Sequence, residues 1–354
     1  MSSLYDTLIS RIKISGPITV AEFMSECLMH PKYGYYQRQK VFGTKGDFTT
    51  SPEISQMFGE MIGLWLVDRW KAIGCPQQFN LVECGPGRGT LMADILHAAA
   101  NHTAFSNAAS VVFVEKSKQL KNEQKKRVAD ALWIEDIRAL PDGPTLFVAN
   151  EFFDALPIHQ LQKHDGLWLE RKIGIKDGNL NWSLSAPSAA LSIMPDNLKA
   201  SENGSIVELC PAALSVAGTI AAHIAKYSGA ALIIDYGYDK SAVGDTFQAM
   251  KDHQYSDPLN NIGTSDLTAH VNFDMIGTAA SQKGAAIHGP VPQGTFLMSI
   301  GMGERAMGLS KGAAPKEQDH ILSGLMRLTS PDHMGELFRV LALTSREQTK
   351  VAGF

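Results

Sequence analysis

The sequence predicts an α/β protein built on a doubly wound sheet of mostly parallel strands. Between residues 80 and 235, short apolar runs alternate with segments of helical spacing. The apolar runs show little alternation of apolar and polar residues, which is typical of parallel strands covered by helices on both faces. A glycine-rich turn joins the first run to the first helix. Together these features indicate a sheet that binds a ligand at the carboxyl ends of its strands.

The five expected strands are residues 80–83, 111–114, 132–134, 145–149 and 230–235. Expected helices at 90–100 and 116–129 follow the first and second strands. Because the carboxyl ends of parallel strands meet at one edge, polar residues that end these strands are the candidates for function.

Residues 1–75 are expected to form a helical leader, and residues 76–354 the domain that carries the sheet. Helical spacing covers 18–28 and 54–73 of the leader. Thr19 stands three residues before Glu22, the spacing of a capping box at a helix start.

An inserted, partly β region is expected at about 157–205, where hairpin-like segments surround Asp165-Gly166 and Asp177-Gly178. We expect this insertion on the substrate side. After residue 240 the sequence predicts an irregular polar part and then a helical C-terminal region.

Composition argues against several classes of protein. The 354 residues carry a net charge of -4 and no block of five like charges, so we expect no nucleic-acid partner. No apolar run approaches the roughly 18 residues of a membrane span, so no membrane insertion is expected. The four cysteines form no C-x-x-C pair, and the histidines show no ligand spacing with cysteines or acids. The sequence therefore predicts reduced thiols and no metal site.

The first 20 residues contain Asp6 and lack both a continuous apolar stretch and an Arg-rich transit composition. We therefore expect neither a signal peptide nor a transit peptide, and a cytoplasmic bacterial location.

The glycine loop Glu83–Gly89 is the strongest local signal. Gly85 and Gly87 permit a tight turn and close approach of the backbone to a ligand, and Gly89 permits close packing of the helix start. The spacing is G-x-G-x-G, whereas the Rossmann dinucleotide fingerprint is G-x-G-x-x-G. The acid Glu83 before the glycines suits a cofactor with a cationic amino-acid end, such as S-adenosylmethionine, better than a pyrophosphate.

Two further strand ends add candidates for cofactor binding. Glu115 follows the second strand, where an acid can accept hydrogen bonds from both ribose hydroxyls. This position is common to dinucleotide and S-adenosylmethionine sites and does not choose between them. Asp136 follows the third strand and is a candidate for the adenine amino group, with Ile137 packing on the ring. A solvated turn acid explains Asp136 nearly as well.

The fourth strand ends in a polar segment that contains Asn150, Glu151 and Asp154, with Phe152 and Phe153 between the acids. These apolar neighbours lower the local dielectric around the polar groups. We expect Asn150 to contact the cofactor and the acids to face the substrate.

Segments along nearly the whole chain, in order, resemble the MidA family of class I methyltransferases. The matching segments are 16–24, 30–36, 46–53, the glycine loop, 150–157, 235–237 and 266–273. At position 272 the family pattern usually has Asp, where this sequence has Asn272.

The resemblance implies a class I methyltransferase fold and transfer of a methyl group from S-adenosylmethionine to a protein arginine. The family includes a mitochondrial complex I assembly factor, so a respiratory complex I subunit is an expected substrate. The resemblance also implies that residues 46–53 close over the cofactor, with Thr50 and Ser51 contacting its carboxylate.

The candidate catalytic residues follow from the chemistry of a guanidinium. Glu151 and Asp154 are candidates to hold its N–H groups in bidentate pairs, with Glu53 as a third acid. His159 is a candidate to remove the proton, although a lone histidine beside a hairpin is more often structural.

Two alternatives remain at this point. One is a nicotinamide-dependent oxidoreductase on the same architecture, and the other is an assembly factor that keeps the cofactor-binding fold without catalysis. The absent third glycine of the dinucleotide fingerprint counts against the first, and the intact loop counts against the second.

Overall fold

We describe a computed structural model of the chain, covering residues 3–37, 50–252 and 254–354. Two compact units make up this part of the chain. The leader unit comprises the described residues of Met1–Phe48, Asp154–Ser215 and Lys240–Asn272. The sheet unit comprises those of Thr49–Phe153, Val216–Asp239 and Phe273–Phe354. Residue 75, an expected boundary, lies between two elements of the sheet unit. No helix among the described residues is long and apolar enough to cross a membrane.

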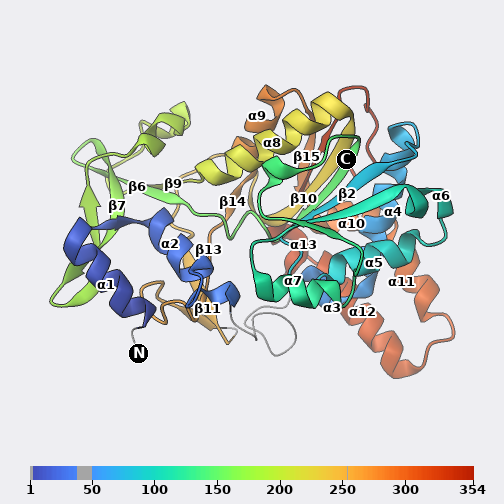
Figure 1. The fold of residues 1–354 in the computed structure, drawn as a ribbon, viewed down its shortest axis with the longest axis horizontal. Helices are drawn as coiled ribbons and strands as arrows, with labels where there is room; N and C mark the ends of the chain where they lie inside the picture. Colours follow the sequence, from blue (N-terminus) through green and yellow to red (C-terminus); the bar gives the residue numbers. More distant parts are fainter. Residues whose placement is uncertain (1–2, 38–49, 253) are drawn as a thin grey trace. The chain divides into compact units, whose positions relative to one another are not determined.

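The sheet unit is built on a sheet with the strand order β15-β16-β10-β5-β2-β3-β4 (Figure 1). Its parallel strands match the expected runs closely and are β2 (Phe79–Cys84), β3 (Ala109–Val114), β4 (Leu132–Ile134), β5 (Thr145–Asn150) and β10 (Gly229–Tyr238). Two antiparallel strands, β15 (Ala286–Pro292) and β16 (Phe338–Thr344), stand at one end of this order. The expectation of a helical C-terminal region is thus wrong for these two strands. The sheet is doubly wound and mostly parallel, as predicted.

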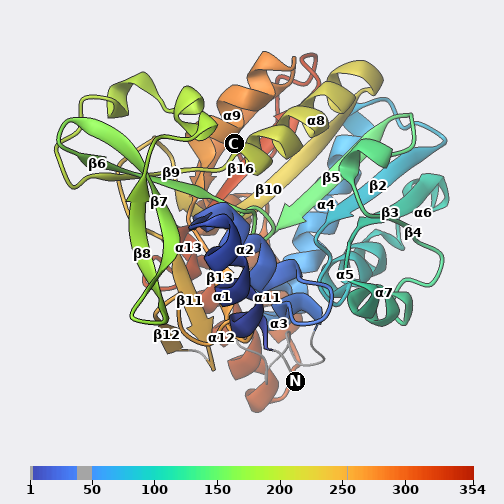
Figure 2. The same cartoon turned by 60° about the vertical axis from the view of Figure 1, so that its left-hand side comes forward.

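Helices cover both faces of this sheet (Figures 1 and 2). On one face lie α8 (Pro211–Tyr227) and α9 (Phe273–Gln282), and His223 of α8 meets the ring of Phe147 edge-on. The helices whose side chains share the core of the other face include α4 (Gln56–Ala72), α5 (Thr90–Ala99), α10 (Gln293–Ser299), α11 (Met302–Ser310) and α12 (Pro315–Thr329). The other helices that the structure describes in this unit are α3 (Ser51–Ile54), α6 (Thr103–Ala108), α7 (Lys118–Lys125) and α13 (Met334–Leu337).

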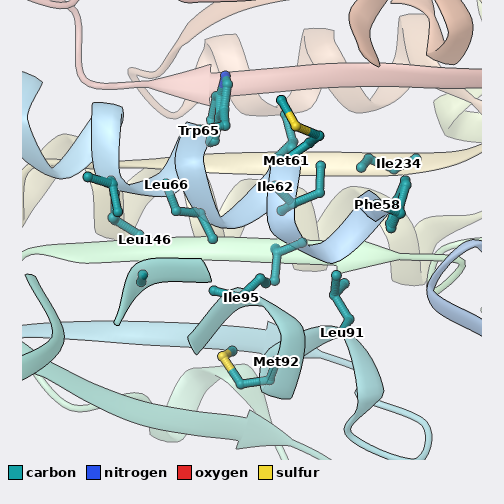
Figure 3. Close-up of a cluster of buried hydrophobic side chains, with 14 of the residues drawn as sticks. Phe58, Met61, Ile62, Trp65, Leu66, Leu91, Met92, Ile95, Leu146 and Ile234 are labelled. Carbon is teal, nitrogen blue, oxygen red and sulfur yellow. The ribbon is translucent and has the colours of Figure 1, made fainter. Parts of the chain in front are cut away.

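The core beneath α4 shows why the strands are apolar on the face that α4 and α5 cover. Figure 3 shows side chains of α4 facing those of α5, with Leu146 of β5 and Ile234 of β10 beside them. Gly63 lets the two helices approach closely, because a Cβ there would lie 3.0 Å from the carbonyl oxygen of Ile95. This packing holds the start of α5, and with it the glycine loop, against the sheet.

The leader unit contains α1 (Leu4–Ser15) and α2 (Val20–Met29) packed against β strands. One sheet has the order β1-β7-β6-β9, with β8 beside β7. Its strands are β1 (Ile18–Thr19), β6 (His159–His164), β7 (Leu167–Lys176), β8 (Asn179–Ser185) and β9 (Ile206–Leu209). The remaining strands are β11 (Gln248–Lys251), β12 (Gln254–Ser256), β13 (Asp266–Thr268) and β14 (Val271–Asn272).

Turn chemistry sets the hairpins of this unit. Asp165-Gly166 and Asp177-Gly178 join β6 to β7 and β7 to β8, and all four residues have positive φ, as type I′ turns require. The expected hairpins are therefore confirmed.

At the start of α2, Thr19 forms the expected capping box with Glu22. Ile18 and Thr19 are not helical, however. They pair with Ile173 and Lys172 of β7, because a capping residue has extended backbone and can continue a strand.

Candidate active site

The glycine loop follows β2 and opens α5 in the backbone conformation that its glycines permit. Gly85, Gly87 and Gly89 have φ of 65°, 50° and 79°. A Cβ on Gly85 would lie 2.7 Å from Cδ2 of Phe152, which follows the end of β5. The ring of Phe152 thus packs directly on the side-chain-free surface of Gly85.

Glu83, the last acid before the glycines, is buried between β3 and β5. Burial raises the pKa of Glu83 to about 8; a hydrogen bond with the backbone of Met92 lowers it, and the charges of Asp94 and Glu115 raise it further. Its Oε2 has no hydrogen-bond partner within the described ranges. A buried acid with an open acceptor suits a cationic ligand, which would favour the charged carboxylate.

Glu115 lies just beyond β3 and is also buried. Its Oε1 accepts a hydrogen bond from the backbone N–H of Ser117 at 2.7 Å, and its Oε2 accepts one from Nε2 of Gln124 at 3.1 Å. Burial raises the pKa of Glu115, and these hydrogen bonds oppose the rise. The carboxylate is thus held in one orientation at the strand end where the sequence predicts a ribose.

Asp136 and Ile137 differ in burial. Asp136 is 43% exposed at its side chain and pairs with the guanidinium of Arg138, which holds the pKa of Asp136 well below its usual range. It also caps the 3-10 helix Ile137–Ala139 by accepting from the backbone N–H of Arg138 at 2.9 Å. Ile137 is buried. A capping role therefore accounts for the position of Asp136 without a ligand.

The end of β5 carries Asn150 and Glu151. Oε1 of Glu151 accepts hydrogen bonds from the backbone N–H of Ser51 at 2.9 Å and from Nδ2 of Asn150 at 3.0 Å. Glu151 has a positive φ of 49°, and its own N–H donates to the carbonyl of Ile234 on β10. Oδ1 of Asn150 has no hydrogen-bond partner among the residues that the structure describes. Contacts from far along the chain therefore position this acid.

The short helix α3 brings further candidates beside these strand ends. Thr50 is its capping residue and Ser51 is buried, with Oγ unpartnered by any described residue. Oε1 of Glu53 accepts from the hydroxyl of Thr90 at 2.8 Å, and its Oε2 lies 3.6 Å from the guanidinium of Arg88. Glu53 is thus tied to the glycine loop. Residues 46–49 of the expected covering loop lie outside the described residues.

Asp154 and His159 belong to the leader unit. Asp154 is buried, and its carbonyl accepts from the N–H of Ala269. Its charge, with that of Asp266, raises the pKa of Tyr36, for which burial is the largest cause. Nδ1 of His159 lies 2.6 Å from Oε1 of the buried Glu170 on the neighbouring strand β7. His159 is therefore not a lone histidine but half of a pair.

Sequence reasoning missed two residues of this edge. Gln124 contacts both the glycine loop and Glu115, and Phe152 packs on Gly85. Phe152 lies in the polar segment that the sequence analysis already named as a candidate site, so its position could have indicated a role. Gln124 lies in a polar stretch of α7 that offers none.

These residues fit S-adenosylmethionine. Glu83 and Asn150 leave acceptor oxygens open, which suits the ammonium of an amino acid, and the carboxylate of Glu115 is held in one orientation by Ser117 and Gln124. An anionic pyrophosphate would gain no such pairing from the buried Glu83.

Comparison with known proteins decides the family. The model of one family, S-adenosyl-L-methionine-dependent methyltransferases, matches residues 61–291. The protein arginine methyltransferase NDUFAF7 of Xenopus tropicalis is 36% identical, with 100% of this chain and 89% of the relative covered. Its mouse counterpart is 39% identical, with 96% and 84% covered. This chain belongs to that methyltransferase family.

A solved structure supports the same assignment. The crystal structure of a Burkholderia thailandensis protein bound to S-adenosyl-homocysteine has a TM-score of 0.85 and 25% identity, covering 99% of this chain and 93% of that one. The protein is therefore an S-adenosylmethionine-dependent methyltransferase of class I fold, and S-adenosylmethionine is its cofactor. These comparisons favour the methyltransferase over both the nicotinamide alternative and the non-catalytic alternative.

The expected cytoplasmic bacterial location is wrong, because the curated relatives at this level of identity are named as mitochondrial proteins. The expectation rested on the composition of 20 residues. Such a short segment carries too little information to fix a compartment.

Proposed function

We propose that this methyltransferase transfers the methyl group of S-adenosylmethionine to an arginine side chain of a protein. The observation that carries the proposal is the carboxylate of Glu151, held at the end of β5 by Ser51 and Asn150. Relatives that are named protein arginine methyltransferases and align along nearly the whole chain support it.

Arginine is a difficult acceptor, since its guanidinium remains protonated with a pKa above about 12. When bound, S-adenosylmethionine supplies an electrophilic methyl group for in-line displacement. Orienting the acceptor nitrogen against that methyl can contribute on the order of 7–11 kcal/mol to lowering the barrier. A carboxylate that grips two N–H groups holds the positive charge away from the attacking nitrogen.

Glu151 is proposed to hold the guanidinium of the acceptor arginine. Because two N–H groups already fix its Oε1, the carboxylate is oriented before a substrate arrives. Asp154 is proposed as a second acid for the guanidinium and Glu53 as a third. His159 is proposed to accept the proton released after transfer.

The proposed cofactor site follows the strand ends. Glu83 and Asn150 would bind the amino-acid end, the glycines Gly85, Gly87 and Gly89 would allow close backbone approach, and Glu115 would bind the ribose hydroxyls. Asp136 and Ile137 are proposed for the adenine, and Thr50 and Ser51 for the cofactor carboxylate. The leader 1–75 and the insertion 157–205 are proposed to bind the protein substrate.

The proposed acceptor, to be tested first, is a subunit of respiratory complex I. Mass spectrometry of complex I and of the whole proteome, with and without the gene, would be searched for arginine methylation. We expect one or a few arginines to lose methylation and to regain it with the wild-type gene but not with Glu151→Gln.

Purified protein, tritiated S-adenosylmethionine and the peptide around the affected arginine form the second arm. Label on another residue type would overturn arginine as the acceptor. Label on arginine of an unrelated protein would overturn complex I alone.

A further inference from the structure

Gln124 of α7 connects three parts of the cofactor edge through one buried amide. Nε2 donates to the carbonyl oxygen of Gly87 at 2.8 Å and to Oε2 of Glu115 at 3.1 Å. Oε1 accepts from the indole N–H of Trp133 on β4 at 2.8 Å. The side chain has no exposed surface.

These contacts fix which way the amide faces. The indole of Trp133 can only donate, and the carbonyl of Gly87 can only accept, so the two ends of the amide cannot be exchanged. Both hydrogens of Nε2 then meet acceptors, one on the glycine loop and one on the acid at the end of β3. A buried amide satisfied in this way stabilises one arrangement of its neighbours.

The backbone of the loop is also close to this residue. A Cβ on Gly89 would lie 3.4 Å from Cα of Gln124, so α7 rests directly on the start of α5. The main-chain hydrogen bonds between β2 and β3 reach as far as the N–H of Gly85, which donates to the carbonyl oxygen of Val114. The amide adds a contact beyond that point, between Gly87 of the loop and the acid after β3.

We propose that Gln124 is a positioning residue for the cofactor, which sets the glycine loop and Glu115 at the separation that a ribose requires. It acts through Glu115 and Gly87 rather than by touching the cofactor. The inference rests on the proposed ribose role of Glu115 and is independent of which substrate accepts the methyl group.

The test is calorimetric binding of S-adenosyl-homocysteine and of its 2′-deoxy analogue. Gln124→Met keeps the length of the side chain but cannot hydrogen-bond in this way. We expect it to weaken S-adenosyl-homocysteine binding by about tenfold, the effect of losing a hydrogen bond to a charged group. The 2′-deoxy analogue, which lacks one hydroxyl for Glu115, should be weakened much less. The preference for the natural ribose should therefore shrink.

Three further variants sharpen the result. Gln124→Glu places a carboxylate against Glu115 and the Gly87 carbonyl and should weaken binding more than Gln124→Met. In Glu115→Gln, adding Gln124→Met should cost less than it does in the wild type, because the two residues act in one chain of contacts. Gln119→Met, the same change on the same helix, should leave the ribose preference unchanged.

Equal weakening of both ligands by Gln124→Met would overturn the proposal and assign Gln124 a purely structural role. Additive effects of the Gln124 and Glu115 changes would overturn it as well. Because only cofactor binding is measured, neither outcome bears on arginine as the methyl acceptor.

Discussion

The ends of β2 and β5 lie in the same sheet, yet they position their polar groups in different ways. After β2 the backbone does the positioning, since three glycines take positive φ and Glu83 is buried by its own strand's neighbours. After β5, Glu151 is positioned by a contact with Ser51, 100 residues away in sequence, and by Asn150. The first arrangement is encoded locally, whereas the second exists only in the folded unit.

This difference separates two kinds of effect. Changes after β2 should act on cofactor binding, because the loop is proposed to provide the surface that the cofactor approaches. Changes after β5 should act on methyl transfer, because the oriented carboxylate there is proposed to hold the acceptor. A variant after β2 that lowered kcat without weakening cofactor binding would contradict this distinction, and so would a variant after β5 that weakened cofactor binding.

Glu151→Gln should have the largest effect. The amide can still accept a hydrogen bond from Ser51, so the fold around α3 should persist, but the negative charge is lost. We expect kcat to fall by about 10³-fold, the upper range for removing one preorganised electrostatic contact. The Kd for S-adenosyl-homocysteine should change by less than about threefold, since Glu151 is proposed to contact the acceptor and not the cofactor.

Steady-state kinetics and calorimetry on the same preparation measure both quantities. Glu135→Gln, at an acid whose side chain is 66% exposed, serves as the control and should be silent. Undiminished turnover in Glu151→Gln would show that Glu151 does not hold the acceptor guanidinium.

Gly85→Val should have the next largest effect, and on binding rather than on kcat. The new Cβ would meet Phe152 at 2.7 Å in a backbone conformation that valine strongly disfavours. We expect the loop to shift and the Kd for S-adenosyl-homocysteine to rise by about 100-fold or more, equivalent to roughly 2.7 kcal/mol.

Gly74→Val is the matched control. Gly74 also has positive φ, 88°, but a Cβ there meets nothing within 4 Å. It should lose only about 1–2 kcal/mol of stability from the strained backbone and keep its affinity. Equal loss of affinity in the two variants would show that general destabilisation, not the loop, controls binding.

Sequence predicted the parts of this architecture that are local. The apolar runs of β2, β3, β4, β5 and β10 identify parallel strands, because such strands are buried on both faces. The two antiparallel strands were missed for identifiable reasons. β15 contains Pro290 and Pro292, which interrupt a strand pattern, and β16 follows a run of helices.

The residues of the candidate site divide in the same way, into those predictable from local sequence and those that only the fold brings together. The glycine loop and the strand-end acids could be named from sequence, since each sits at a turn that its own residues specify. The contact of Ser51 with Glu151 could not, because nothing in either segment encodes the other. Gln124 could not be predicted for a related reason. The polar sequence of α7 is typical of a solvent-exposed helix, and only the folded structure shows that Gln124 is buried.

Glu83→Gln should have a smaller, pH-dependent effect. Burial raises the pKa of Glu83 from 4.5 to about 8, so between these pH values the folded protein keeps a proton that the unfolded chain has lost. The free energy of unfolding of the wild type therefore falls as pH rises through this window. Glutamine does not titrate. The Tm of the variant minus that of the wild type should increase by roughly 2 °C per pH unit from pH 5 to 8 and then level off.

Thermal unfolding of the cofactor-free proteins between pH 5 and 9 measures this difference. Glu123→Gln is the control, because Lys126 lowers the pKa of that exposed acid and its titration lies below the window. A flat difference for Glu83→Gln would mean that the acid is already ionised in the folded protein, and that the end of β2 resembles the end of β5 more closely than the burial of Glu83 suggests.

Asp136→Ala should have the smallest effect, and it tests whether the third strand end belongs to the cofactor site at all. Loss of the cap and of an exposed ion pair should lower stability by about 1 kcal/mol. If Asp136 also contacts the adenine amino group, the Kd for S-adenosyl-homocysteine should rise by about fivefold, the effect of one lost hydrogen bond. Arg138→Ala removes the ion pair but keeps the acid, so it should leave the affinity unchanged. Equal weakening by Asp136→Ala and Arg138→Ala would assign Asp136 to the turn alone, and the adenine would then be held by apolar contacts such as that proposed for Ile137.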